Sequence, residues 1–245
     1  MQRISISSMQ SLLAIECSSH VGAVAYLRDI TRPDEWAGES TRDEVKLSAW
    51  VLPAIERVLA KAGASARDVK VVAFGAGPGS FTGVRTACAT AQALAYAWQT
   101  PLIAVDCLEA LAQASALSRV DVVLDARMNE LYAAAFERSC AGDLRRISET
   151  RICAAADFVA HDSTTVLGTG SSLVSTGNVR ATTDDLRAAE ARWAYGVARV
   201  AVRKLARNET TEPRDAEPIY LRNKVAFTEA ERAAKTPSMP ERRSA

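Results

Sequence analysis

Short apolar runs open the chain and give way to a longer segment with helical periodicity. Ser11–Cys17 and Val21–Leu27 are apolar and flank the turn-like residues 18–20, a pattern that predicts two strands of a hairpin. Asp43–Ala62 repeats its apolar residues at helical spacing and is followed by Gly63. Glycine just beyond the last helical residue is a common helix stop, so the pattern predicts a helix over this segment.

Strand and helix patterns then alternate along the chain. Val69–Phe74 and Leu102–Val105 are short apolar runs of the kind found in buried strands. Val84–Trp98 is rich in small residues and predicts a helix, as does Leu108–Leu117. Strands that alternate with helices are typical of an α/β domain with a largely parallel core.

A second unit shows the same mixture of patterns. Two apolar runs, Val120–Asp125 and Leu131–Phe136, predict a pair of strands that turn at residues 128–129. Thr165–Leu167 is a further candidate strand, and Ala188–Arg207 predicts one long helix. The chain therefore divides into two α/β units.

The two ends of the chain look different from these units. The first residues are polar and lack the apolar stretch of a signal peptide, and Met9 is an alternative start. Beyond Thr228 the sequence is charged, contains proline and has no periodicity, which is typical of disorder. The predicted division is residues 1–11 as a flexible arm, 12–118 as the first α/β lobe, 119–227 as the second α/β lobe, and 228–245 as a disordered tail.

The composition narrows the classes of function. Apolar residues make up 48% of the chain and charged residues 24%, as in soluble globular proteins, and a net charge of +1 argues against nucleic acid or membrane as a direct partner. The five cysteines lack C-x-x-C spacing and the two histidines are far apart, so the sequence predicts neither a disulfide framework nor a zinc site. No apolar run reaches the ~18 residues of a membrane span, and free cysteines suit a reducing cytoplasm.

The strongest local pattern is the Gly-rich stretch 75–83, GAGPGSFTG, which follows a strand and opens a helix. Glycines let backbone N–H groups approach an anion, and the helix N-terminus adds a positive dipole end. The stretch is neither a Walker loop nor G-x-G-x-x-G, so a phosphate loop and a structural turn both remain open. The residues of this candidate phosphate site are Glu16, Gly77, Gly79, Ser80, Thr82 and Gly83.

Four strings carry a family resemblance. They are LLAIECSS (12–19), GAGPGSFTGVR (75–85), DARMNELYAAAF (125–136) and AEPIYLRNKVAF (216–227). In this order and spacing they resemble the TsaB family, also called YeaZ, from Leu12 to Phe227. The string G-P-G-S-F-T-G-V-R is specific to this family and its catalytic relatives, and P-x-Y-L-R-N narrows the resemblance to TsaB.

The resemblance implies an actin-like ATPase fold with two linked α/β lobes. It also implies a non-catalytic scaffold for threonylcarbamoylation of the adenosine next to the anticodon in tRNAs that read ANN codons. The implied partners are TsaD, the catalytic homologue, and TsaE, an ATPase, with tRNA bound only through the complex and a homodimer formed when the chain is alone. No cofactor of its own is implied, since ATP or ADP and the metal belong to the partner subunits, and the location is cytoplasmic with no membrane contact.

The sequence departs from the family pattern at two places. Glu16 stands where actin-like ATPases carry an Asp that helps position metal-bound phosphate, and residues 42–44 replace a turn that usually contains histidine. The hairpin turn at residues 18–20 has neither Gly nor Lys. These departures argue against independent nucleotide binding and leave the first hairpin open as a purely structural element.

The resemblance assigns the first two long helices to the partner interface. Ala87, Ala91 and Ala95 lie four apart, so they share one helix face and allow another helix to approach closely. On this interpretation Ala91→Arg would block association and leave the chain folded; the alternative is that this face packs inside the lobe. The full set of candidate interface residues is Leu47, Val51, Val84, Ala87, Cys88, Ala91 and Ala95.

Other interpretations remain beside the scaffold. An ATP-dependent kinase or carbamoyltransferase of the actin-like fold would use the Gly-rich stretch, and a peptidase would need a nucleophile or metal that the sequence does not supply. His161-Asp162 is better explained as loop residues than as a catalytic base with its orienting acid. The closing string 217–223 is expected either to hold the C-terminal chain against the body, with Arg222 free to pair, or to pack only on the last helix.

Overall fold

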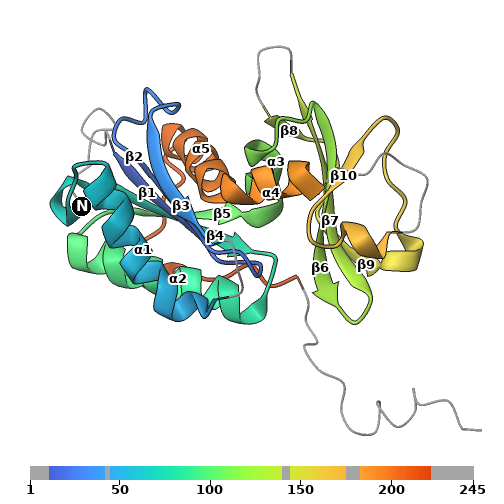
Figure 1. The fold of residues 1–245 in the computed structure, drawn as a ribbon, viewed down its shortest axis with the longest axis horizontal. Coiled ribbons are helices and arrows are strands. Elements are labelled where there is room, and N and C mark those ends of the chain that lie inside the picture. Colours follow the sequence, from blue (N-terminus) through green and yellow to red (C-terminus); the bar gives the residue numbers. More distant parts are fainter. Residues whose placement is uncertain (1–10, 42–44, 140–143, 175–182, 222–245) are drawn as a thin grey trace, which may run out of the picture.

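The computed structural model describes residues 11–41, 45–139, 144–174 and 183–221. Its described strands form two sheets that lie side by side with helices between them (Figure 1). The first sheet contains β1 (Leu12–Glu16), β2 (Ala23–Leu27), β3 (Trp36–Ser40), β4 (Val71–Gly77) and β5 (Leu102–Asp106). The second contains β6 (Arg119–Arg127), β7 (Glu130–Arg138), β8 (Leu144–Arg146), β9 (Arg151–Ala154) and β10 (Thr165–Leu167).

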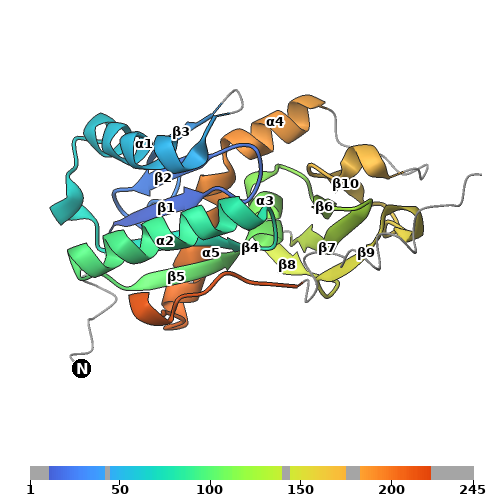
Figure 2. The same ribbon diagram turned by 90° about the horizontal axis from the view of Figure 1, so that it is seen from below.

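Helices cover both faces of the first sheet. Its strand order is β3-β2-β1-β4-β5, with β1 antiparallel to β2 and parallel to β4. One face carries α1 (Leu47–Lys61) and α2 (Phe81–Trp98), and the other carries α5 (Trp193–Ala206), as Figures 1 and 2 show. Every residue of β1, β2 and β4 is buried, which explains their nearly continuous apolar sequences, whereas the edge strand β3 is half-buried.

The second sheet joins the first through one continuous core. Its order is β10-β6-β7-β8, with β9 pairing to the same strand β7. Helix α3 (Cys107–Ala114) lies between the sheets with α5, and one buried cluster runs from Leu12 of β1 to Phe136 of β7. The lobes are therefore held together by shared apolar packing as well as by the chain connections.

Most of the predicted elements are confirmed. The β1–β2 hairpin, the strands β4 and β5, and the β6–β7 pair are all present, and the latter turns at Met128 and Asn129 with φ of 58° and 60°. Gly63 follows α1 with φ of +61°, as the helix-stop pattern predicts. The actin-like α/β fold predicted from the resemblance is confirmed.

Three local predictions were wrong or incomplete. The predicted single helix 188–207 is two helices, α4 (Thr183–Ala191) and α5, separated at Arg192. The break lets Trp193, fully buried, donate its indole N–H to the Cys107 carbonyl at 3.1 Å, which anchors the start of α5. Strand β3 was missed because it is a half-buried edge strand, and the short strands β8 and β9 gave no pattern.

The predicted boundary at residues 118/119 stays a prediction. Helix α5 belongs by sequence to the second segment, yet it packs on β1, β2, β4 and β5 of the first sheet. Residues 1–10 and the predicted tail 228–245 lie outside the described residues.

The described residues also form four short 3-10 helices: Ala66–Asp68, Ala155–Asp157, Ser171–Leu173 and Pro213–Asp215. No helix in the described part of the chain combines the length and apolar character needed to cross a bilayer.

Candidate functional site

A cleft of about 840 Å³ opens between the two lobes. Its walls come from the turn 18–20 after β1, the loop 79–82 after β4, and residues 124–128 at the end of β6. Residues 186–190 of α4 and the segment 219–221 close the remaining sides. Ligands of open α/β sheets bind outside the carboxyl ends of the strands, which is the position of this cleft.

The glycines of the Gly-rich stretch make room for protein backbone. A Cβ atom on Gly83 would overlap the carbonyl oxygen of Cys17, and one on Gly79 would lie 2.5 Å from the carbonyl oxygen of Ser18. Gly77 has φ of +114°, and a Cβ there would lie 2.9 Å from the carbonyl oxygen of Ile219. The close approach that glycine permits is therefore made by neighbouring segments of the same chain.

Several N–H groups of the stretch also have partners within the chain. Ser80 N–H donates to the Ser18 carbonyl at 2.6 Å, and Gly77 N–H points to Cys107 Sγ at 3.1 Å. Gly83 N–H lies 3.4 Å from Ser80 Oγ, which caps α2. These contacts favour the structural-turn interpretation over a loop that surrounds a phosphate.

Only part of the candidate phosphate site faces the cleft. Gly79, Ser80 and Thr82 line it, and all three lie at the start of α2. Glu16 and Gly83 are buried away from the lining. Of the six predicted residues, three therefore line the cleft and the other three do not.

The Glu16 carboxyl is sealed inside the first lobe. It accepts the Ser18 N–H at 2.5 Å and lies 3.3 Å from Cys107 Sγ. A Cβ on Gly75 would overlap this carboxyl, which shows how closely β4 covers it. Burial raises the pKa of Glu16 above its usual value of 4.5, against the lowering effect of the Ser18 hydrogen bonds. The carboxyl is therefore not presented to a metal ion in the cleft.

We expect Glu16→Gln to change how stability depends on pH. A carboxyl whose pKa is raised by folding stabilises the folded state most at low pH, and this contribution is lost as pH rises through the folded pKa. The unfolding free energy of wild type should fall relative to the variant above pH 4.5, the usual pKa, by at most about 1.4 kcal/mol per pH unit. Urea unfolding of both proteins between about pH 5 and 8 measures the difference. If their unfolding free energies changed with pH in parallel, the raised pKa of the buried Glu16 carboxyl would be contradicted.

The candidate interface residues on α2 lie inside the first lobe. Ala87, Ala91 and Ala95 have no exposed surface and pack against the sheet. Val51, Val84 and Cys88 are also buried, and Leu47 is half-buried. The small-residue face thus serves internal packing, the alternative left open by the sequence, because the helix must approach β4 closely.

The outer surface of the same two helices carries exposed apolar side chains. Leu52 is 49% exposed, Phe81 45% and Tyr96 80%. A groove of about 460 Å³ lies here, lined by residues of α2, including Phe81 and Ala89, and by Ser48 of α1. Of these three exposed side chains, Phe81 also lines the groove.

The closing string is held against the first lobe. Ile219 N–H donates to the Ala76 carbonyl at 2.7 Å, and Arg85 Nε donates to Tyr220 Oη at 2.8 Å. The Arg85 guanidinium also lies 3.5 Å from the centre of the Phe81 ring. The prediction that this string holds the C-terminal chain to the body is confirmed as far as residue 221, and Arg222 lies outside the described residues. The segment after α5 runs back along the first lobe in Figure 2.

His161 pairs with Asp121 of β6 and not with its sequence neighbour. Its Nδ1 lies 2.9 Å from Asp121 Oδ1, and its backbone N–H donates to Asp121 Oδ2 at 2.8 Å. Thr164 Oγ1 donates to the same carboxylate, which is almost fully buried. None of the three lines the interlobe cleft. Within the described residues, no group of three or more His, Cys, Asp or Glu side chains is arranged to hold a metal ion.

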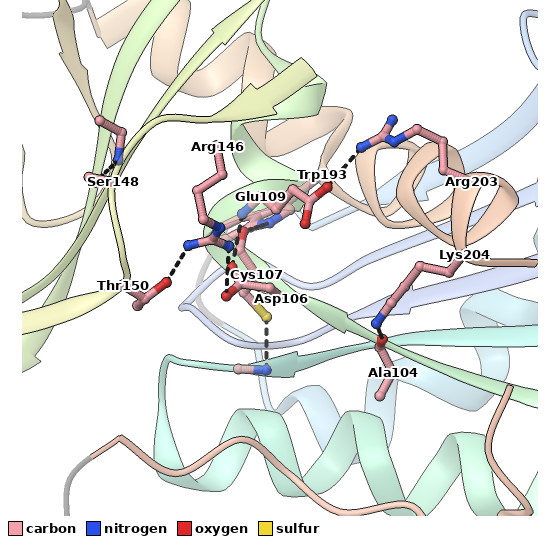
Figure 3. Close-up of polar contacts among 12 residues, drawn as sticks. Ala104, Asp106, Cys107, Glu109, Arg146, Ser148, Thr150, Trp193, Arg203 and Lys204 are labelled. Atoms are coloured by element: carbon pink, nitrogen blue, oxygen red, sulfur yellow. Dashed lines mark hydrogen bonds and ion pairs between the residues drawn. The ribbon is translucent and has the colours of Figure 1, made fainter. Parts of the chain in front are cut away.

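An ion pair connects the two sheets. Arg146 reaches from β8 to Asp106 at the start of α3, 3.1 Å away, as Figure 3 shows. Burial raises the pKa of Asp106, while the Arg146 charge lowers it. Arg203 of α5 pairs with Glu109 at 2.9 Å nearby. This link between lobes had no sequence signal, because its members are 40 residues apart and neither belongs to a motif.

We expect Arg146→Met to destabilise the fold by about 2 kcal/mol, because Asp106 would remain buried without its cation. The expected loss is smaller than the roughly 3–5 kcal/mol of a fully buried pair, since both side chains keep some exposure. Arg145→Met is the matched control: that side chain is 71% exposed, so its loss should cost less than about 0.5 kcal/mol. Urea unfolding compares them, and equal effects would mean that the interlobe pair contributes nothing.

Adding Asp106→Asn to Arg146→Met should recover part of the lost stability, because the remaining group is then uncharged.

The comparisons with known proteins agree with this geometry. The family model described as "TsaD: tRNA N6-adenosine threonylcarbamoyltransferase" matches residues 44–165. The tRNA threonylcarbamoyladenosine biosynthesis protein TsaB of Haemophilus influenzae is 32% identical over 234 residues, 89% of this chain and 95% of that one. TsaB of Escherichia coli is 34% identical and covers 72% of this chain and 81% of its own. Among solved structures, YeaZ from Pseudomonas aeruginosa matches with a TM-score of 0.72 and 27% identity, covering 87% of this chain and all of that one.

The two sheets, their strand order and the cleft between them define a protein of the actin-like ATPase fold in which glycines of the Gly-rich stretch pack against backbone of the same chain. The similarity over most of the length then identifies the family. The chain belongs to the TsaB family of tRNA threonylcarbamoyladenosine biosynthesis proteins.

Proposed function

We propose that this protein is a non-catalytic subunit in the synthesis of N6-threonylcarbamoyladenosine in tRNA, where it supports the catalytic homologue TsaD. The observation that carries the proposal is the inward-turned Glu16 beneath a Gly-rich stretch occupied by backbone. A catalyst of the actin-like fold needs a carboxylate and free N–H groups facing the phosphates. Here the carboxylate faces Cys107, so a scaffold role is the best supported.

The partner surface in this proposal is the outer side of α1 and α2. It exposes Leu52, Phe81 and Tyr96, of which Phe81 lines the groove, and aromatic side chains are enriched in protein interfaces. The same surface would serve a homodimer when the chain is alone and TsaD in the complex, so the two assemblies should compete. TsaE and tRNA would join through the complex, which would carry the nucleotide and metal in a cytoplasmic setting.

The test is reconstitution with purified TsaD and TsaE from the same organism, supplied with threonylcarbamoyl-adenylate as the donor of the transferred group, ATP and unmodified tRNA. Threonylcarbamoylated adenosine should form on tRNA only when this chain is present, and the chain alone should hydrolyse neither ATP nor peptides. Co-purification with TsaD measures the partnership separately. Modification at the full rate without this chain, or ATP turnover by the chain alone, would reject the scaffold role.

A further inference from the structure

A buried carboxyl without a partner lies in the wall of the interlobe cleft. Glu190, near the end of α4, is only 6% exposed and lines the cleft. Its Oε1 atom is buried and has no hydrogen-bond partner. Buried polar atoms in folded proteins are almost always paired, so an unpaired one next to a cavity points to a group that completes it.

Among the residues that the structure describes, no protein group donates a hydrogen bond to the Oε1 atom of Glu190. Burial raises the pKa of Glu190, and the charges of His20 and Arg187 only partly oppose this effect. Both of these residues line the same cleft, one from the turn after β1 and one from α4. The site therefore has an acceptor that a hydrogen-bond donor entering the cleft could use.

The N-terminus of α2, which is the positive end of a helix dipole, borders the same cleft. Helix α2 is 18 residues long, and its first residues, including Ser80 and Thr82, form part of the lining. The first N–H groups of a helix have no partner within it, and the helix dipole makes that end attractive to anions. Gly79 and Gly83 are packed against backbone beneath this point, but the first turn itself faces the cleft.

Apolar side chains also line the cleft. Leu124 and Tyr132 come from the second sheet, Leu186 from α4, and Ile219 from the closing string. Polar side chains, among them Asp125, Arg127 and Thr169, share the lining with these apolar ones. The volume of 840 Å³ lies within the range of roughly 300–1,000 Å³ that is usual for small-molecule sites.

We propose that the interlobe cleft binds a small zwitterionic molecule, with its cationic nitrogen at Glu190 and its anionic group at the N-terminus of α2. The anion would be a carboxylate or a phosphate, because a helix N-terminus accepts both. Phe81 and Thr82 line both this cleft and the groove on the outer side of α1 and α2, but Glu190 lines only the cleft. The inference therefore goes beyond the scaffold function and does not depend on it.

The first experiment measures binding to the full-length chain by calorimetry and thermal unfolding. The probes are glycine, β-alanine, γ-aminobutyrate and ε-aminohexanoate, which separate the two charges by increasing lengths, with O-phosphoethanolamine as the phosphate counterpart. At least one should bind saturably, and butylamine and butyrate, which carry one charge each, should bind about tenfold more weakly. Binding of no zwitterion up to about 10 mM, or equal binding of a singly charged probe, would overturn the proposal.

The second experiment assigns the site to Glu190. Glu190→Gln should abolish binding and raise the melting temperature of the free protein, because it replaces an unpaired buried acid with a neutral group. Glu190→Asp, which keeps the charge but shortens its reach, should weaken binding and provides a second readout if the amide variant misfolds. Glu56→Gln, on the exposed side of α1, is the control and should bind as wild type. Unchanged binding by both Glu190 variants would place the ligand elsewhere and reject the assignment.

Discussion

Replacing Gly83 with alanine should lower the free energy of unfolding by about 3 kcal/mol. The added Cβ would overlap the carbonyl oxygen of Cys17, a backbone atom that follows a buried central strand and has little room to move. Helix propensity acts in the opposite direction, because Gly83 lies in the first turn of α2 and alanine favours a helix by up to about 1 kcal/mol. The contact outweighs propensity, so the net change should be a clear loss.

Gly63→Ala is the control for this prediction. Gly63 has a φ of +61°, whereas Gly83 does not have a positive φ, and a Cβ on Gly63 would meet only the far end of Arg28 at 3.6 Å. Its cost should therefore be the backbone strain alone, about 1 kcal/mol. Chemical denaturation of both variants separates the two effects. A Gly83 variant as stable as the Gly63 variant would show that the turn after β1 moves freely away from α2.

The central strands could be predicted because burial on both faces leaves a continuous apolar run. In β1, Leu12 and Ala14 pack in one core cluster, and Leu13 and Ile15 pack in the other. Strand β3 is half-buried at the sheet edge, so only part of it needs to be apolar. Its Trp36 stacks on Tyr195 with ring centroids 4.8 Å apart, a long-range contact that local periodicity does not reveal.

The break between α4 and α5 illustrates a second limit. No proline or glycine marks Arg192, so the helical pattern appears uninterrupted in sequence. The helix ends there because Trp193 must enter the core between the two sheets. Tertiary packing decides this boundary, and a single sequence holds no local sign of it.

The site shows the same limit in its side chains. The position of Glu16 at the end of a strand could be predicted, but the direction of its carboxyl depends on Cys107, which is far away in sequence. Glu190 gave no signal at all, because an acidic residue in an amphipathic helix is normally exposed. Its burial follows from the packing of α4 against α3, α5 and β3, which only the fold establishes.

A stripe of small residues has two physical meanings that sequence cannot separate. Alanines four apart allow close approach of another helix or of a strand. In α2 the stripe faces the sheet, and its neighbours Ala89 and Tyr96 face outward. The expectation that arginine at position 91 leaves the chain folded was therefore based on the wrong face of the helix.

Ala91→Arg should instead prevent folding, whereas Ala89→Arg should leave the chain folded and block its association with TsaD. Ala91 has no exposed surface, so an arginine there would bury an unpaired charge at a cost above about 4 kcal/mol. Ala89 is exposed in the groove beside α1, where the same side chain should change stability by less than about 0.5 kcal/mol. In the groove its length and charge would hold a docking helix away and leave apolar surface hydrated.

Circular dichroism and urea unfolding test the first half of this pair, and co-purification with tagged TsaD tests the second. The expected result is a soluble, cooperatively folding Ala89→Arg chain that no longer co-purifies, and an Ala91→Arg chain that is unfolded or insoluble. Lys70→Arg, a conservative change at an exposed position just before β4, is the control and should leave both fold and association unchanged. If the folded Ala89→Arg chain still co-purifies with TsaD in normal yield, the outer face of α2 is not the contact, and the partner must bind another surface of this protein.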